Sequence, residues 1–145
     1  MLSFAPSKPK RRSIWDETGV PQRGNRLQQA IERGLPYTAY SRVAQYANMS
    51  NPQLASALGI SMPTLRRRAQ TKYLKVDESD KLYRVAQLIN AATELFAGDK
   101  DKALTWLKTP ARGLNGHTPI MMAETYAGTT EVLDLIGRLE HGVFS

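Results

Sequence analysis

The sequence predicts an all-α fold, and three observations lead to this prediction. From about residue 25 onward, apolar residues recur every three or four positions, as they do on one face of a helix. Capping residues such as Asn51 and Asp99 precede these stretches, and glycines such as Gly59 follow them. No segment alternates apolar and polar residues as a half-buried strand does. The 145 residues, 41% of them hydrophobic and 23% charged, suit one or two small globular domains.

Residues 1–24 are expected to form a basic, flexible arm. They include three prolines and a short basic run made of Lys8, Lys10, Arg11 and Arg12. A segment of this composition has little apolar surface to bury. We therefore expect the arm to be poorly ordered unless something holds Trp15.

The first half of the chain is expected to form four helices. Asn51 is the expected N-cap of the third helix, with Pro52 at its first helical position. Gly59 should end that helix, and Ser61 should begin the next one. The expected helices span residues 25–33, 38–46, 52–58 and 61–71.

The second half is also expected to be helical. Asp77 and Asp99 are the expected N-caps of its first two helices. Gly128 should end the third, and Thr129 or Thr130 should cap the last. The expected helices span residues 77–96, 99–109, 118–126 and 129–142, with a loop at 110–117.

The formal net charge of +7 is divided unevenly along the chain. Residues 1–75 contain 13 Lys and Arg against three acidic residues, a net charge of +10. Residues 76–145 contain seven Lys and Arg against ten acidic residues, a net charge of −3. A basic half that meets a polyanion and a second half with another task would explain the division. Solvated surface charge would explain it equally well.

Residues 54–68 match the helix-turn-helix pattern of DNA-binding proteins. Two helices that cross steeply need a small residue at their contact, and Ala55 supplies it. The tight connection between them needs a backbone that tolerates positive φ, which Gly59 provides. The alternative is a helical hairpin with a solvated basic end, and the pattern together with the local charge favours DNA binding. The apolar residues that would fill the angle between the helices are Leu54, Leu58, Ile60 and Leu65.

The second helix of this motif would lie in the major groove of DNA. With Leu65 pointing inward, Arg67 and Gln70 face outward and are the candidates for base contacts, because Arg pairs with guanine and Gln with adenine. Arg68 lies nearer the buried side, where the pattern usually has an apolar residue. Arg68, Lys72 and Lys75 are expected to contact phosphates. The predicted DNA-binding residues are Ser61, Thr64, Arg66, Arg67, Arg68, Gln70, Lys72 and Lys75.

Catalytic, metal and membrane functions find no support in the sequence. The chain has no Cys, and His117 and His141 are 24 positions apart with no further ligand at metal-site spacing. Gly113 and Gly116 do not form a phosphate-binding loop. We therefore expect a protein that is not an enzyme and holds no cofactor or metal. Because no apolar stretch approaches the roughly 18 residues that span a bilayer, and no export signal is visible, we expect a cytoplasmic protein.

A set of residues from Gly34 to Ser145 matches, in order, those of a known family. The first half contributes Gly34, Leu35, Pro36, the helix-turn-helix, Glu78, Ser79, Asp80, Leu82 and Arg84. The second half contributes residues 95–99, Ala103, Trp106, Leu107, Leu114, Gly116, Pro119, Thr125 and residues 138–145. By these residues the chain resembles the Xre/ParS/MbcA-type antitoxins, which are partners of RES-domain toxins.

The resemblance implies a two-part antitoxin. A DNA-binding domain, residues 25–75, would bind operator DNA and repress the antitoxin's own operon. A toxin-binding domain, residues 98–145, would lie over the active-site cleft of a RES-domain toxin that degrades NAD⁺. Apolar chain ends usually dock on their own domain or on a partner, and the resemblance favours a partner. The toxin-binding residues that it implies are Arg138, Glu140, His141, Gly142, Val143, Phe144 and Ser145.

The segment between the two domains, residues 76–97, is expected to help form a homodimer. Its apolar residues, Leu82, Tyr83, Val85, Leu88, Ile89 and Leu95, lie on more than one side of the expected helix. Two helix-turn-helix units in a dimer would contact half-sites about one DNA turn, roughly 34 Å, apart. One alternative is a dimeric helix-turn-helix transcription factor without a toxin partner. Another is a chaperone or adaptor whose basic half contacts RNA.

Overall fold

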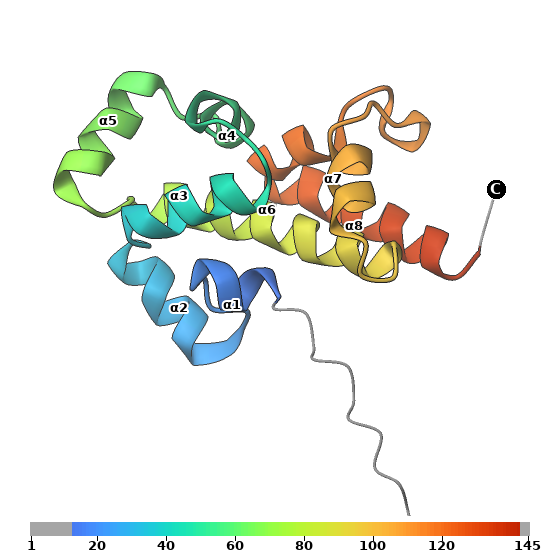
Figure 1. The fold of residues 1–145 in the computed structure, drawn as a ribbon, viewed down its shortest axis with the longest axis horizontal. Coiled ribbons are helices and arrows are strands. Elements are labelled where there is room, and N and C mark those ends of the chain that lie inside the picture. The colour runs from blue at the N-terminus through green and yellow to red at the C-terminus, as the bar shows by residue number, and fades with distance from the viewer. Residues whose placement is uncertain (1–12, 143–145) are drawn as a thin grey trace, which may run out of the picture.

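The structure, a computed structural model, describes residues 13–142 as a bundle of helices (Figure 1). These residues contain no strand, only one isolated bridge between Pro36 and Tyr73, so the all-α prediction is confirmed. No helix in this part of the chain is long and apolar enough to cross a membrane. The α-helices are α1 (Ile14–Thr18), α2 (Gly24–Arg33), α3 (Tyr37–Tyr46), α4 (Asn51–Leu58), α5 (Met62–Thr71), α6 (Val76–Leu95), α7 (Lys100–Leu107) and α8 (Tyr126–Glu140). Two 3-10 helices are η1 (Arg112–Leu114) and η2 (Pro119–Glu124).

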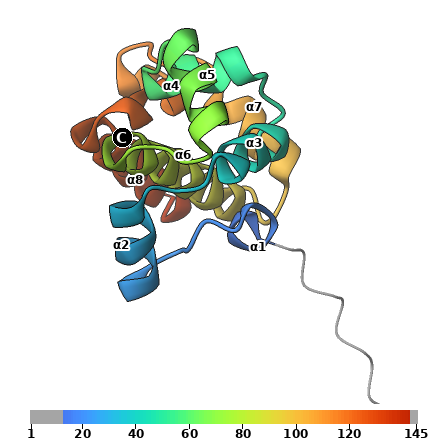
Figure 2. The same ribbon diagram turned by 90° about the vertical axis from the view of Figure 1, so that its left-hand side faces the viewer.

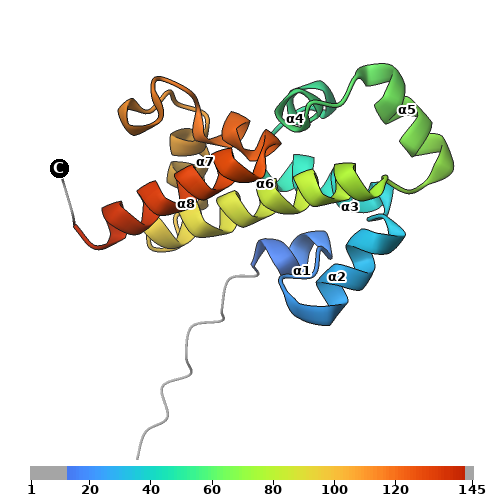
Figure 3. The ribbon, with the colours of Figure 1, turned by 180° about the vertical axis from the view of Figure 1, so that it is seen from behind.

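Helix α6 runs through the middle of the molecule (Figures 1 and 3). It packs against helices from both halves of the chain. Those from the N-terminal half are α1, α2, α3 and α4, and those from the C-terminal half are α7, η2 and α8. A helix that is apolar on several sides is buried. Most of the apolar residues that suggested a dimer surface on α6 are covered within the chain, while Tyr83 and Leu95 are half-buried. The buried ones are Leu82, Val85, Ala86, Leu88, Ile89 and Ala92. The homodimer itself stays a prediction.

The two halves of the chain share one hydrophobic core. Tyr40 and Leu58 from the first half, and Leu107 and Ile136 from the second, belong to the same cluster of buried residues. Helix α4 packs directly against η2, so the two halves also meet outside α6. We infer that the two halves of the chain fold as one unit.

The predicted flexible arm contains a helix. Ser13 caps α1 by accepting a hydrogen bond from the backbone N–H of Asp16, and Ile14 and Val20 are buried. The ring of Trp15 lies against that of Tyr83 in α6, with 5.8 Å between the centroids. Trp15 is thus held, which is the condition under which the sequence predicts an ordered segment, and residues 13–20 pack on the core. Residues 1–12 lie outside the described part.

Helix starts differ from the expected ones by one or two residues. Ser50, not Asn51, is the N-cap of α4, and its hydroxyl accepts from the N–H of Gln53. The N-cap of α6 is Lys75, not Asp77. The carboxylate of Glu78 accepts a hydrogen bond from the backbone N–H of Lys75. Each observed start makes a side-chain hydrogen bond three residues away, as a capping box does. The expected N-caps Ser61 and Asp99 are confirmed.

Residues 118–130 differ most from expectation. In place of an α-helix that ends at Gly128, the chain forms η2 and then begins α8 at Tyr126, with Thr125 as the N-cap. The hydroxyl of Thr125 accepts from the N–H of Gly128 at 2.9 Å. A Cβ atom at Gly128 would lie 2.3 Å from the carbonyl oxygen of Met122. Gly128 is therefore the residue that lets η2 pack closely on the first turn of α8, and not a helix end.

Candidate DNA-binding and toxin-binding surfaces

Helices α4 and α5 form the predicted helix-turn-helix. Gly59 follows α4 in the left-handed conformation, with φ 68°, which an L side chain rarely adopts. The N–H of Ile60 then donates to the carbonyl of Ala55 at 2.8 Å, which closes the turn. The packing that the sequence predicts for this motif is confirmed, because the residues expected at the contact between its helices are all buried. They are Leu54, Ala55, Leu58, Ile60 and Leu65.

The outer face of α5 presents polar side chains to solvent. Arg66, Arg67 and Gln70 are exposed, as expected of residues that contact DNA. Thr64 is half-buried, and its hydroxyl accepts hydrogen bonds from Ser61 Oγ at 2.9 Å and from Arg67 Nη2 at 3.3 Å. Arg67 is thus held along the helix by Thr64. Ser61 serves as the N-cap, so its hydroxyl is occupied by the helix.

Arg68 is engaged within the chain. Its Nε and Nη2 donate to the two carboxylate oxygens of Glu78 at 2.6 and 3.1 Å, in a bidentate pair between α5 and α6. The exposed fractions of the two side chains are only 13% and 9%. The structure therefore contradicts the expectation that Arg68 contacts phosphate, because its guanidinium fixes α5 against α6. Helical spacing already indicated an inward position, since Arg68 falls on the side of α5 that faces the core.

Burial alone would raise the pKa of Glu78. The hydrogen bonds from Arg68 and from the N–H of Lys75, together with the positive charges of both residues, outweigh burial and lower the pKa below its usual value. Glu78 is therefore ionised at neutral pH. An ionised Glu78 keeps the recognition helix at a fixed angle to the central helix of the molecule.

The remaining predicted cations lie at the C-terminal end of α5. Lys72 is the C-cap of α5 and is exposed, and its carbonyl accepts from the N–H of Tyr37 at 2.8 Å. Lys75 is also exposed. With Arg66 and Arg67, these side chains form an exposed basic surface along α5 and the turn after it. A basic surface beside a recognition helix matches the phosphate backbone that flanks a major groove.

The predicted toxin-binding residues begin in the last turn of α8. Arg138 and Glu140 are exposed there, and His141 and Gly142 follow the helix, also exposed. Arg138 and His141 border a shallow hollow of about 420 Å³ that Leu133 also lines. Val143, Phe144 and Ser145 lie outside the described residues. Among residues 13–142, no group of three or more His, Cys, Asp or Glu side chains could hold a metal ion.

Sequence reasoning missed an apolar surface on α2 and beside it. Leu27, Ala30 and Ile31 share one face of α2, yet none of them is buried. Tyr73 and Val76, close to the C-terminal end of α2, are 57% and 52% exposed. This surface lies at the same end of the molecule as α5 (Figure 2). The signal in the sequence is the strongly amphipathic pattern of residues 25–33.

Two protein-family models match consecutive parts of this chain. Residues 26–87 match the antitoxin Xre-like helix-turn-helix domain. Residues 91–142 match the antitoxin Xre/MbcA/ParS C-terminal toxin-binding domain. A protein of Yersinia enterocolitica named antitoxin Xre is 40% identical over 148 aligned residues, which cover the whole of both chains. This chain belongs to the antitoxin Xre family.

Two further relatives carry the same name. The antitoxin Xre of Photorhabdus laumondii is 35% identical over the full length of both chains. The antitoxin Xre of Pseudomonas putida is 38% identical over 84 residues, which are 57% of this chain and 52% of that protein. The two family matches in this Xre antitoxin meet inside α6, and neither includes α1. Its DNA-binding and toxin-binding parts thus share the central helix.

Proposed function

We propose that this antitoxin neutralises a RES-domain toxin that degrades NAD⁺ and that it represses its own operon. The C-terminal end of the chain, from Arg138 onward, lies over the active-site cleft of the toxin and denies it the nucleotide. Helix α5 binds operator DNA, with Arg67 and Gln70 at the base edges and Lys72 and Lys75 at phosphates. The antitoxin acts by binding alone, so it needs no cofactor of its own, and it works in the cytoplasm, where operator and toxin are found.

The positions of α5 and of the C-terminal end of α8 support this proposal. Helix α5 lies at one end of the long molecule and the C-terminal end of α8 lies at the other (Figures 1 and 3). The two ends are joined by α6 and by a common core. A toxin bound at the C-terminal end therefore leaves α5 accessible to DNA. One chain can hold both partners at once, as an antitoxin that also represses requires.

We further propose that the antitoxin is a homodimer that forms through the apolar surface of α2, Tyr73 and Val76. Because most apolar residues of α6 are buried within the chain, we place the interface at its exposed first residue, Val76, and on the residues beside it. Tyr73 and Val76 are exposed, and the apolar face of α2 beside them, at the same end of the molecule as α5, is half-buried. A twofold axis beside it places two recognition helices next to each other, as an operator with two half-sites about 34 Å apart requires.

Co-expression with the protein encoded by the neighbouring gene tests the antitoxin function. The neighbouring gene product alone should arrest growth and deplete cellular NAD⁺. Co-expression of this chain should restore both growth and the NAD⁺ level. Growth arrest that persists despite soluble antitoxin would refute the antitoxin proposal, and growth arrest without NAD⁺ loss would refute the identity of the toxin.

Sedimentation of the Ile31→Glu variant tests the dimer. The new charge has to be desolvated in an apolar interface, so the variant should sediment as a monomer where the parent chain is a dimer. Gln29→Glu adds the same charge at an exposed position of the same helix and should leave the dimer intact. A dimeric Ile31→Glu variant would exclude this surface as the interface.

A further inference from the structure

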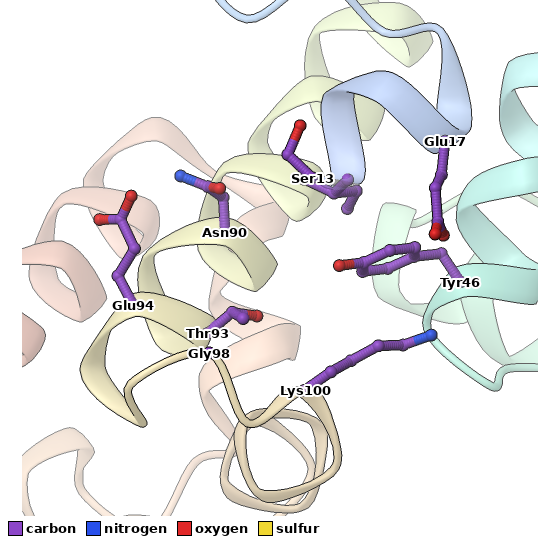
Figure 4. A pocket seen from close by; sticks show the side chains of 9 residues that line it. Ser13, Glu17, Tyr46, Asn90, Thr93, Glu94, Gly98 and Lys100 are labelled. Carbon is purple, nitrogen blue, oxygen red and sulfur yellow. The ribbon is translucent and has the colours of Figure 1, made fainter. Parts of the chain in front are cut away.

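Helix α7, in the toxin-binding part, contacts the end of α3 with two lysines. At the end of α7, Lys108 Nζ donates to the carbonyls of Ala47 and Asn48 at 2.8 and 3.4 Å. At the start of α7, Lys100 Nζ lies 4.1 Å from the centroid of the Tyr46 ring. Figure 4 shows Lys100 reaching toward Tyr46 across the rim of a pocket. Both cations therefore lie at the C-terminal end of α3, immediately before the turn into α4.

The chemistry of this contact suits a fixed attachment. The last carbonyls of a helix carry partial negative charge, so a cation placed there is stabilised. Burial lowers the pKa of Lys108, because its ammonium has exchanged part of its hydration for these carbonyls. Asn48 adopts a positive φ of 52°, so the turn has a specific backbone shape that the lysine contact holds.

The other end of α4 is also covered by the toxin-binding part. A Cβ atom at Gly59 would lie 2.6 Å from Glu124 Oε1, so the side chain of Glu124 lies directly over the helix-turn-helix turn. Glu124 ends η2, and η2 packs along α4. Arg84 of α6 holds this end of η2 by donating to the carbonyls of Ala123 and Glu124, each at 3.0 Å.

We propose that Lys108 and Lys100 are positioning residues for operator binding. They hold the turn that begins α4, and α4 in turn carries the tight connection to α5. Through α4 they fix the place at which α5 presents Arg67 to the DNA. The inference rests on the proposed operator binding. It adds that residues of the toxin-binding part, outside the helix-turn-helix match at residues 26–87, belong to the DNA-binding machinery.

We call the contacts of Lys100 and Lys108 with the end of α3 the lysine clamp. It matters because side chains that contact bases need a precise position. The side chains that bind a partner have to be held within about 0.5 Å of the positions in which they make their contacts. The apolar contacts of α4 with α5 transmit any shift of α4 to the recognition helix, because closely packed interfaces transmit strain. Phosphate contacts tolerate such a shift better, since they depend on charge more than on exact position.

The test measures how the full-length Lys108→Met variant binds two duplexes of equal length at one fixed salt concentration. One duplex contains the promoter upstream of the antitoxin's own gene, and the other has a random sequence. Lys108→Met should lower the affinity for the promoter duplex about tenfold while changing the affinity for the random duplex little. Lys108→Arg keeps a cation that can donate to both carbonyls, and it should restore most of the loss.

Lys102→Met is the matched control. Lys102 is on the same helix, its removal changes the net charge equally, and it is exposed, as Lys108 is. In the described part of the chain its ammonium makes no hydrogen bond to the end of α3, whereas that of Lys108 does. A loss for Lys108→Met that is equal on both duplexes and no larger than that of Lys102→Met would show a charge effect and overturn the inference. Unchanged promoter binding by Lys108→Met would overturn it as well.

Hydrogen exchange separates this inference from the proposed function. If the parent chain does not distinguish the two duplexes, operator binding fails, but the clamp can still be measured. Lys108→Met should then speed amide exchange in α4 at least fivefold relative to Lys102→Met. Equal exchange in the two variants would overturn the clamp. Should Lys108→Met fail to fold, Lys100→Met provides the same comparison, with a smaller effect of about twofold because a cation–π contact is weaker.

Discussion

Three adjacent residues at the start of α6, Glu78, Ser79 and Asp80, each bind a different part of the fold. Glu78 binds Arg68 of α5. The hydroxyl of Ser79 accepts from the N–H of Leu35 at 2.8 Å, just before α3. Asp80 pairs with Arg84, which holds the end of η2. These residues of the family resemblance therefore have structural roles. Glu78 and Ser79 attach α5 and the segment before α3 to α6, and Asp80 pairs with Arg84 within α6.

Replacing Glu78 with Gln should destabilise the protein at neutral pH. The variant loses the charge that pairs with the nearly buried Arg68, so its free energy of unfolding should fall by about 2 kcal/mol. Because the pKa of Glu78 is lowered in the folded state, the parent chain has this stabilisation above the usual pKa of 4.5 and loses it as the pH falls further. Urea unfolding should show a smaller difference between parent and variant at pH 3 than at pH 7. An equal difference at both pH values would contradict the account.

Replacing Gly59 with Ala should destabilise the helix-turn-helix. An Ala at φ 68° carries a backbone penalty of about 1–2 kcal/mol, and Glu124 has to move away from the new methyl group. Gly137→Ala is the control, because Gly137 lies inside α8 with open space around it and should gain about 0.5–1 kcal/mol. Thermal unfolding of the two variants should therefore shift in opposite directions. A shift of the same sign for both would rule out the left-handed turn.

At the scale of helices, the recognition helix α5 should separate sequence-specific from general DNA binding. Arg67→Ala should weaken binding to the operator by about 1–3 kcal/mol and change binding to random duplex little. Lys72→Ala should weaken binding to both duplexes alike and reduce the salt dependence. Titrations at several salt concentrations measure both effects. A uniform loss for Arg67→Ala would mean that Arg67 contacts phosphate and not a base.

Helices could be predicted from the sequence wherever a local signal sets them. Ser61 and Asp99 are caps as expected, and the apolar residues at every third or fourth position predict the span of α6 to within two residues. Signals with two physical meanings are not decided by the sequence alone. Gly128 can end a helix or allow a close contact, and only the packing of η2 on α8 shows the second. Apolar residues on several sides of α6 can indicate a dimer interface or a helix at the centre of the fold. Which of the two holds depends on residues far away in the chain that pack on α6.

The candidate DNA-binding site also combines features that the sequence predicts with features that it does not. The outward face of α5 follows from helical geometry, so Arg66, Arg67 and Gln70 could be predicted as exposed. The engagement of Arg68 depends on Glu78, ten residues away in the next helix, which helical spacing within α5 does not reveal. The lysine contacts between α7 and α3 join residues about 60 positions apart and have no local signal.

At the scale of the whole molecule, one continuous core joins two surfaces at opposite ends. The basic half, with a net charge of +10, carries α5, and the half with −3 carries the C-terminal end of α8. The antitoxin therefore needs no interdomain movement to meet DNA and toxin together. Only the DNA contact should depend strongly on salt, because it alone displaces counterions from phosphates.

Inhibition of NAD⁺ consumption by a purified RES-domain toxin tests the central claim most directly. The full chain should abolish consumption at one antitoxin chain per toxin chain. A chain that ends at Gly137 should leave the toxin active while it still binds operator DNA with the affinity of the full chain, because α5 lies at the far end of the molecule. Continued NAD⁺ consumption in the presence of excess full chain would contradict the account.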